Sequence, residues 1–224
     1  MKNIIKKTLL TGSLIALFSF ESAKEKITLF DKPNPKLWYT FHEKGGLNND
    51  TGKVFSYENG ALQVSGKEFA YIATQSEYSN YRLTLEFKWG IKKYPPRQNE
   101  KRDAGIIYHF PLSVSDKIWP KGVEYQIQET DCGDFWIIGD ITLKTKGEQK
   151  SEYGFNHIVK FTNAEKPSGE WNKVEIVTLN GKCTHYLNGI LVNEATNVSI
   201  NSGRILLQSE GAEVYYRNVI LEKL

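Results

Sequence analysis

Short stretches in which apolar and polar residues alternate run along most of the chain. Residues 81–89, YRLTLEFKW, place Leu83, Leu85 and Phe87 on one face and polar side chains on the other, as expected for a half-buried β-strand. Similar or wholly apolar stretches predict further strands at residues 61–64, 105–110, 123–128, 173–179, 182–187, 190–193, 204–209 and 213–222. The chain is therefore expected to be built from strands.

Turn signals separate these predicted strands. Asn180-Gly181 and Asn188-Gly189 each join two neighbouring stretches, and an Asn-Gly pair favours a tight hairpin because both residues readily adopt positive φ. The sequence shows neither a long amphipathic helix nor a repeat. We therefore predict an all-β fold, a jelly-roll sandwich of two antiparallel sheets. Residues 134–170 form a less regular segment, of a length that often carries function.

One predicted strand has an unusual polar face. Glu124, Gln126 and Gln128 alternate with apolar residues, so their carboxylate and amides share one side. An acidic stretch follows and closes on Phe135 and Trp136. The pattern leaves two interpretations open. It is either an exposed strand face followed by a turn, or a site where carboxylates, amides and a flat aromatic surface hold a polyhydroxylated ring.

Two other predicted strands carry polar residues that suit the same kind of ligand. One presents Glu86 and Lys88, and the other presents Gln208 and then Glu210. Amides both donate and accept hydrogen bonds, as sugar hydroxyls require. We expect the three strands to line a groove for a sugar chain on one concave sheet.

The N-terminus has the parts of a secretory signal peptide. A basic stretch precedes an apolar run at residues 8–20, and Glu21-Ser22-Ala23 offers a cleavage point. The apolar run is too short to span a bilayer comfortably, although an uncleaved membrane anchor is the alternative. We therefore predict a signal peptide at residues 1–23 and one domain at residues 24–224. The mature protein is expected to be secreted or periplasmic, without stable membrane insertion.

Charge and cysteine content add little to this picture. The formal net charge of +3 falls to about +1 when residues 1–23 are removed, so it gives no argument for nucleic acid as a partner. The basic residues around Pro95-Pro96 are expected to form a solvated loop. Cys132 and Cys183 lack zinc-site spacing, and the sequence leaves open both a disulfide between them and the oligomeric state.

A set of short motifs occurs along the chain in the order found in a known family. Any one motif is weak, but the ordered set is specific. The motifs are Leu29-Phe30-Asp31 with Trp38, then YRLTLEFKW, Asp103-Ala104-Gly105-Ile106, Glu124-Tyr125-Gln126-Ile127, Gly169-Glu170-Trp171-Asn172, His185-Tyr186-Leu187-Asn188-Gly189, Ile205-Leu206-Leu207-Gln208 and Tyr216-Arg217-Asn218-Val219. The chain thereby resembles the 3-keto-disaccharide (3-keto-glycoside) hydrolase domain family over residues 27–224.

The resemblance implies a concanavalin A-like fold, export, and action on glycosides whose sugar is oxidised to a ketone at carbon 3. The ketone acidifies the hydrogen at carbon 2, and a base can remove it. The enolate then expels the glycosidic oxygen by β-elimination, and water adds across the double bond. Such a site needs a base near carbon 2, an electrophile or cation near the ketone oxygen and an acid near the leaving oxygen.

Candidate residues for these roles come from the polar strand faces. Glu124 is expected to be the base or a metal ligand, Lys88 to stabilise the enolate, and His109 to be an acid or a metal ligand. The residues expected to bind the sugar are Glu86, Gln126, Gln208, Glu210, Trp89 and Trp136. The residues expected to hold a divalent cation such as Ca²⁺, Mn²⁺ or Zn²⁺ are Glu129, Asp131 and Asp134. No nucleotide cofactor is expected.

Two other function classes compete with a 3-keto-glycoside hydrolase or lyase. The first is a non-catalytic carbohydrate-binding module, since one fold can host either function. The second is an ordinary endo-glucanase, which needs two carboxylates flanking the scissile bond. Gln126 stands two residues after Glu124, where a paired carboxylate would be expected, so this class ranks lowest.

Overall fold

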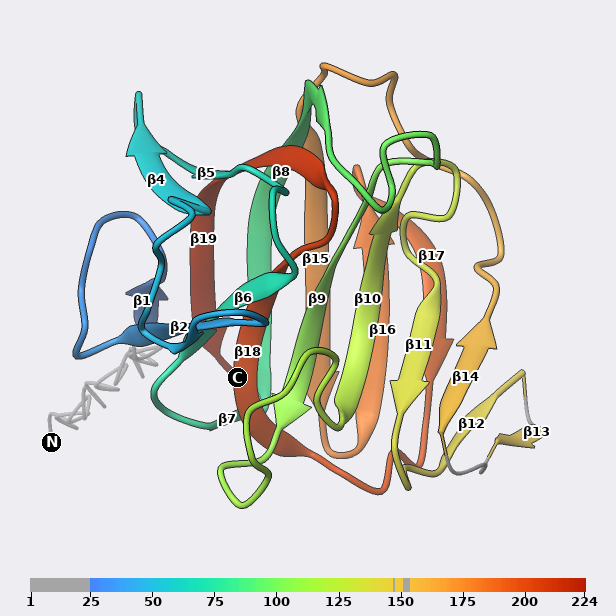
Figure 1. Cartoon of the computed structure of the whole chain (residues 1–224). Helices are drawn as coiled ribbons and strands as arrows, with labels where there is room; N and C mark the ends of the chain where they lie inside the picture. The colour runs from blue at the N-terminus through green and yellow to red at the C-terminus, as the bar shows by residue number, and fades with distance from the viewer. Residues whose placement is uncertain (1–24, 147, 151–153) are drawn as a thin grey trace, which may run out of the picture.

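The computed structural model describes residues 25–146, 148–150 and 154–224, so the predicted signal peptide at residues 1–23 lies outside the described part. Two large antiparallel sheets pack face to face (Figure 1). The all-β sandwich predicted from the sequence is thus confirmed. No helix in the described part is long and apolar enough to cross a membrane.

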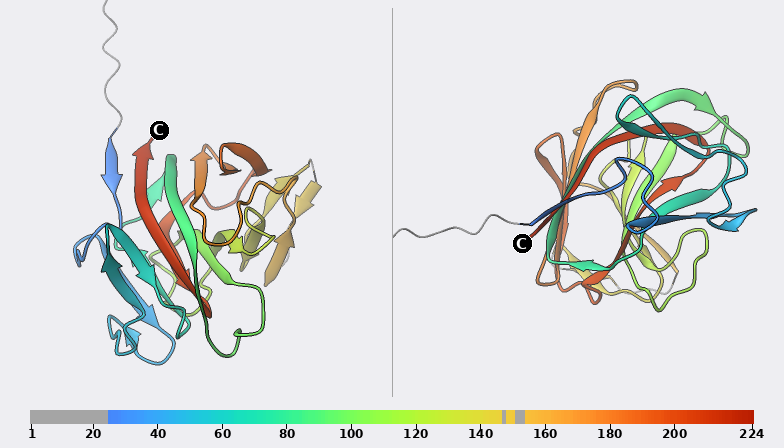
Figure 2. Two further views of the ribbon diagram at one scale, coloured as in Figure 1. Left: turned by 90° about the horizontal axis from the view of Figure 1, so that it is seen from above. Right: turned by 90° about the vertical axis from the view of Figure 1, so that its left-hand side faces the viewer.

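The first sheet has eight strands. In spatial order they are β17 (Ile190–Ala195), β16 (Lys182–Leu187), β15 (Asn172–Leu179), β8 (Tyr81–Lys93), β19 (Ala212–Lys223), β5 (Ala61–Val64) and β4 (Phe55–Glu58), with β1 (Lys26–Thr28) paired to β19. Figure 2 shows β1 beside the C-terminal end of β19. The two ends of the described chain therefore meet on one sheet.

The second sheet has nine strands and lies in front of the first in Figure 1. Its order is β14 (Phe155–Ile158), β11 (Phe135–Ile138), β10 (Gly122–Gln128), β9 (Asp103–Phe110), β18 (Ser202–Ser209), β6 (Ala70–Thr74), β2 (Trp38–His42) and β3 (Gly46–Leu47), with β7 (Tyr78–Ser79) paired to β18. A separate two-stranded ladder joins β12 (Leu143–Thr145) to β13 (Glu148–Lys150).

The main core fills the space between the two sheets. From β8 it takes Leu83, Leu85 and Phe87, all essentially inaccessible to solvent, as the alternating pattern predicts. From β10 it takes Tyr125 and its apolar neighbours, so the polar face of β10 points away from the core. Full burial of one such apolar side chain contributes roughly 1.5–3 kcal/mol to the stability of the fold. Polar substitutions on the inward face of a strand are therefore expected to be destabilising.

The predicted hairpins are also present. Asn180-Gly181 joins β15 to β16, and Asn188-Gly189 joins β16 to β17, with positive φ at all four residues. The segment at residues 134–170 is more regular than expected, because it contains β11 to β14. Cys132 and Cys183 are free, buried thiols and are not joined by a disulfide.

Candidate active site

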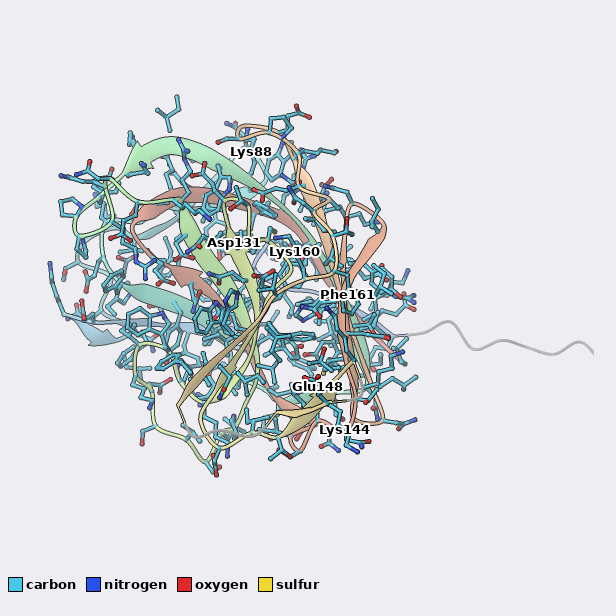
Figure 3. All side chains as sticks on the ribbon, turned by 90° about the vertical axis from the view of Figure 1, so that its right-hand side faces the viewer. Lys88, Asp131, Lys144, Glu148, Lys160 and Phe161 are labelled. Atoms are coloured by element: carbon cyan, nitrogen blue, oxygen red, sulfur yellow. The ribbon has the colours of Figure 1, made fainter. Side chains whose placement is uncertain are left out.

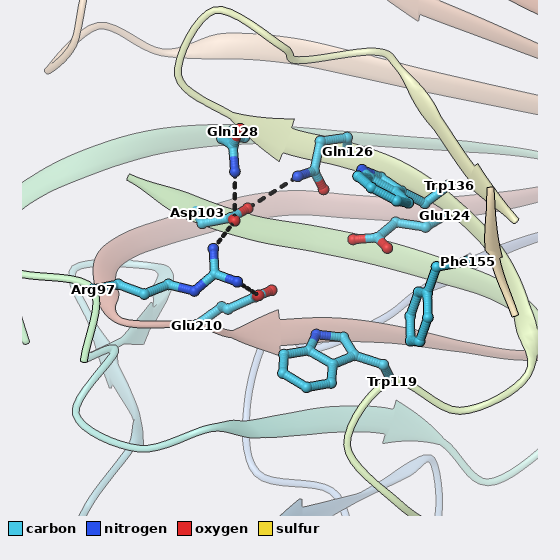
Figure 4. Close-up of a pocket in the computed structure, with 9 residues that line it drawn as sticks. All are labelled: Arg97, Asp103, Trp119, Glu124, Gln126, Gln128, Trp136, Phe155 and Glu210. Atoms are coloured by element: carbon cyan, nitrogen blue, oxygen red, sulfur yellow. Dashed lines mark hydrogen bonds and ion pairs between the residues drawn. The ribbon is translucent and has the colours of Figure 1, made fainter. Parts of the chain in front are cut away.

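A pocket of about 390 Å³ opens on the outer face of the nine-stranded sheet (Figure 4). This is the face that β10 turns away from the core. Strands β9, β10, β11 and β14, two loops and one turn contribute to its wall. The lining residues are Arg97, Asp103, Trp119, Glu124, Gln126, Gln128, Trp136, Phe155 and Glu210. A pocket of this size lies in the range that holds small ligands.

Strand register places Glu124 at the floor of the pocket. Glu124 stands opposite Ile107 on β9 and Trp136 on β11, while Gln126 stands opposite Gly105. Gly105 has no side chain, and a Cβ atom there would overlap the side-chain oxygens of both Glu124 and Gln208. A glycine is therefore required at position 105, because the side chains of Glu124 and Gln208 meet in the space that a Cβ atom would occupy.

Gln208 lies beside this floor but is not among the residues that line the pocket. Its side chain is only 4% exposed, and its amide contacts the carboxyl group of Glu124 and lowers the pKa of that group. A buried amide is costly unless it has a polar partner, and Glu124 is that partner here.

A single guanidinium group links two carboxylates at the other end of the pocket. Arg97 forms an ion pair with Asp103 and a second one with Glu210, whose Oε1 lies 2.7 Å from Nη2. Asp103 also accepts hydrogen bonds from Gln126 (3.1 Å) and Gln128 (2.5 Å). These contacts, drawn as dashed lines in Figure 4, occupy both oxygens of Asp103.

Three carboxyl groups thus lie in one pocket, two of them paired with Arg97, and their pKa values differ. Burial, opposed by Arg97, raises the pKa of Asp103 to about 6. Burial and the charge of Asp103 raise the pKa of Glu210 to about 8. Burial, with further repulsion from Glu210 and Asp103, raises the pKa of Glu124 well above its usual range. Groups with such separated proton affinities are typical of acid–base sites.

Aromatic side chains form the upper walls. Trp119 and Phe155 stand on one side of Glu124 and Trp136 on the other in Figure 4. Trp136 is braced by the parallel ring of His157, with ring centroids 4.5 Å apart, and His157 is held by Asp134 at 2.6 Å. Flat aromatic faces beside carboxylates and amides can pack against the apolar face of a sugar ring while its hydroxyls are bound below.

The loop that carries Trp119 is fixed to the sheet by buried polar contacts. Asp116, from the same loop, accepts hydrogen bonds from Tyr39 (2.6 Å) and Tyr71 (2.5 Å). Arg204 on β18 donates to the carbonyl oxygens of residues 111 and 114 and stacks 3.7 Å from the ring centre of Phe110. The position of Trp119 is therefore set by the fold.

Lys88 and Glu86 lie elsewhere, and their expected place in the groove is wrong. Both belong to β8, which is a strand of the eight-stranded sheet. Glu86 binds Arg217 at 2.8 Å, and the Lys88 ammonium lies 5.0 Å from the ring centre of Trp171. Figure 3 shows Lys88 well apart from Asp131 and Lys160. The pocket's guanidinium comes from Arg97 instead.

Trp89 and His109 also lie outside the pocket, on the core side of their strands. Trp89 lies on the same face of β8 as Leu83, Leu85 and Phe87. Its ring centroid lies 5.9 Å from that of Phe87 within the core. His109 has a φ of +57°, which breaks the alternation of β9 and turns its ring toward Tyr81 and Tyr108. Burial lowers the pKa of His109 to about 4.

The carboxylates expected to share a divalent cation are separated. Glu129 binds Arg102 at 2.6 Å, Asp131 binds Lys101 at 2.9 Å, and Asp134 binds His157. Within residues 25–146, 148–150 and 154–224, no three His, Cys, Asp or Glu side chains are arranged to hold a metal ion. These residues do not fit the expected metal site.

Several pocket residues were missed by sequence reasoning. Arg97 lies in the basic loop expected to be solvated, and Asp103 begins a strand that reads as apolar. Trp119 and Phe155 lie outside every predicted strand. The alternation of β9 does indicate part of the site. Asp103, Gly105 and Ile107 face outward on the same side of the strand, and Gly105 and Ile107 pair with Gln126 and Glu124 on β10.

Comparison with solved structures supports the fold. A protein from Parabacteroides distasonis assigned as a glycosyl hydrolase shares 21% identity, with 89% of this chain and 94% of that chain covered and a TM-score of 0.59. The β-glucanase of Bacillus licheniformis shares 11% identity over 91% and 99%, with a TM-score of 0.57. The carbohydrate-binding module CBM66 of Bacillus subtilis shares 13% over 83% and 95%, with a TM-score of 0.56.

These neighbours include both enzymes and a binding module, and at such identities they establish the jelly-roll fold alone. No curated protein matches the chain significantly. The model of the 3-keto-alpha-glucoside-1,2-lyase-like domain family, in contrast, matches residues 25–222, which is almost the whole described chain. The chain therefore belongs to the 3-keto-alpha-glucoside-1,2-lyase-like domain family, whose members are carbohydrate-acting proteins.

Proposed function

We propose that the protein is an exported enzyme that cleaves the glycosidic bond of 3-keto-glycosides by base-assisted elimination, with or without subsequent hydration. The observation that carries this proposal is that two buried carboxyl groups, Glu124 and Glu210, line one aromatic-walled pocket together with Arg97, which forms an ion pair with Glu210. Family membership supports the choice of a carbohydrate substrate. The signal peptide predicted at residues 1–23 supports export.

The pocket supplies the kinds of group that elimination next to a ketone requires. Two carboxyl groups with raised pKa values can remove and deliver protons near neutral pH. The guanidinium of Arg97 can stabilise negative charge that develops on the ketone oxygen. Gln126 offers an amide for ring hydroxyls, and Trp136 offers a stacking face.

The decisive experiment is to incubate the purified protein with a panel of 3-keto-glycosides and with the matching unoxidised glycosides. We expect release of the aglycone or second sugar from the oxidised compounds only, detected by ¹H NMR. An isotope-labelled water experiment would then show whether oxygen from water enters carbon 1 of the product.

Each of the competing functions predicts a different result from the same panel. A carbohydrate-binding module would bind plain oligosaccharides, measured by calorimetry, and would release nothing from any 3-keto-glycoside. An endo-glucanase would cleave unoxidised polysaccharide. Either outcome would contradict the proposed function, and parallel reactions with a chelator would show whether a divalent cation is needed.

A further inference from the structure

The structure distinguishes the two carboxyl groups of the pocket by their surroundings. Glu124 is 5% exposed, lies between the Ile107 and Trp136 positions of neighbouring strands and contacts the uncharged amide of Gln208. Glu210 is similarly buried but binds Arg97 at 2.7 Å and receives a hydrogen bond from Trp119. An apolar, amide-lined site favours a neutral carboxylic acid, whereas the cation and the N–H donor beside Glu210 oppose the effect of burial and make Glu210 the easier of the two groups to ionise.

Asp103 is not available for proton transfer, although it lines the same pocket. Its Oδ1 accepts from Gln126, and its Oδ2 accepts from Gln128 and pairs with Arg97. These donors occupy both of its oxygens and keep the side chain directed at Arg97. Proton transfer in the pocket is therefore left to Glu124 and Glu210.

Three groups lie in a row along the pocket in Figure 4: Arg97, then Glu210, then Glu124. Elimination involves three adjacent atoms of the sugar, namely the ketone carbon 3, the acidic carbon 2 and carbon 1 with its leaving oxygen. A ring placed along the row would set its ketone oxygen at Arg97, its carbon 2 hydrogen at Glu210 and its leaving oxygen at Glu124.

We propose, on the basis of the proposed function, that Glu210 is the base that removes the carbon 2 proton and that Glu124 is the acid that protonates the leaving oxygen. This assignment reverses the role expected for Glu124 from the sequence. It also replaces His109, which lies in the core, as the acid.

The steps balance without any further reagent. The Glu210 carboxylate takes the proton from carbon 2, and the electron pair moves onto the ketone oxygen beside Arg97. The pair then returns to form a double bond between carbons 1 and 2, the bond from carbon 1 to oxygen breaks, and that oxygen takes the proton of Glu124. If water adds, Glu124 removes a proton from it as oxygen bonds to carbon 1, and Glu210 returns its proton to carbon 2.

Two measurements separate the roles. The first is exchange of the carbon 2 hydrogen with D₂O in 1,5-anhydro-3-ketoglucitol, a compound without a leaving group, followed by ¹H NMR after subtraction of spontaneous exchange. The second is cleavage of a 3-keto disaccharide against a 4-nitrophenyl 3-keto-glucoside, whose leaving group needs no acid. The variants are Glu210→Gln and Glu124→Gln, with Glu86→Gln on the other sheet as the control.

We expect Glu210→Gln to lose about 100-fold or more in exchange and in cleavage of both glycosides, as expected for loss of a general base. Glu124→Gln is expected to lose about 10³-fold on the disaccharide but less than about 10-fold on the nitrophenyl compound, and to keep most of its exchange. The opposite pattern, or equal losses in all assays, would overturn the assignment. Wild-type protein that shows neither exchange nor cleavage would instead overturn the proposed function itself.

Discussion

Replacing Glu124 with Gln is expected to lower kcat for a 3-keto disaccharide by about 10³-fold, the effect of removing a positioned proton donor, while the protein stays folded. Burial and the neighbouring carboxylates raise the pKa of Glu124 well above its usual range, which favours the protonated form. A glutamine has nearly the shape of that neutral form and introduces no change of charge. The catalytic effect should therefore be separable from any effect on folding.

Initial rates of sugar release and the urea unfolding curve, measured on the same preparations, test this prediction. Glu86→Gln is the matched control, because Glu86 binds Arg217 on the outer face of the eight-stranded sheet, away from the pocket. The control should retain the wild-type rate. A Glu124→Gln variant that is folded and keeps more than about one tenth of the wild-type rate would be incompatible with proton donation by Glu124.

Replacing Glu210 with Gln is expected to change how the free energy of unfolding depends on pH. The folded state raises the pKa of Glu210 from its usual 4.5 to about 8, chiefly through burial. Below about pH 4.5 the carboxyl group is protonated in both the folded and the unfolded state. As pH rises from there to about 8, the unfolded state ionises more readily, so the stability contributed by Glu210 is progressively lost.

Glutamine cannot ionise, so the variant should escape this loss. The stability of the wild type relative to Glu210→Gln should therefore fall by up to about 1.4 kcal/mol for each pH unit between about 4.5 and 8, and then level off. Urea unfolding of both proteins across this range is the measurement. Groups that do not interact with Glu210, including the buried neutral His109 and His185, are common to both proteins and cancel in the difference. Glu124 does not cancel fully, because the charge of Glu210 raises its pKa in the wild type alone.

The Glu86→Gln variant again provides a control, now with the opposite sign. A hydrogen bond from Arg217 lowers the pKa of Glu86 in the folded protein. Glu86 should therefore stabilise the fold above its unfolded pKa, and that contribution should be lost as the pH falls. A constant difference between wild type and Glu210→Gln over the whole range would show that Glu210 is not held in a burial-dominated site.

The sequence predicts the local structure of this chain well, for a physical reason that can be traced in β8 and β10. Strand side chains alternate between two faces, so the parity of Leu83, Phe87 and Tyr125 identifies the core side without knowledge of the partner strands. The same parity places Trp89 in the core. A role for Trp89 in sugar binding was therefore in conflict with the pattern from the start.

Which strands share a sheet could not be predicted in the same way. Strand β8 pairs with β15 and β19, which are distant in sequence, whereas β10 pairs with β9 and β11. Alternation gives each strand a polar face but does not say on which side of the sandwich that face lies. Lys88 and Glu124 therefore seemed to share one groove, although they belong to different sheets.

Residues on irregular backbone escaped the sequence reasoning altogether. Arg97 and Trp119 reach the pocket from loops whose course depends on distant contacts, such as those of Arg204 and Asp116. His109 follows the alternation of its neighbours in sequence, but its positive φ turns the side chain to the other face. Periodicity cannot reveal either effect, because both arise from tertiary packing.

The most direct test of the central claim is a crystal structure of the Glu124→Gln variant soaked with a 3-keto disaccharide. The account predicts the oxidised ring between Trp119 and Trp136, with its ketone oxygen at Arg97 and its glycosidic oxygen beside residue 124. A sugar bound elsewhere on the sandwich, with this pocket containing only solvent at saturating concentration, would contradict it.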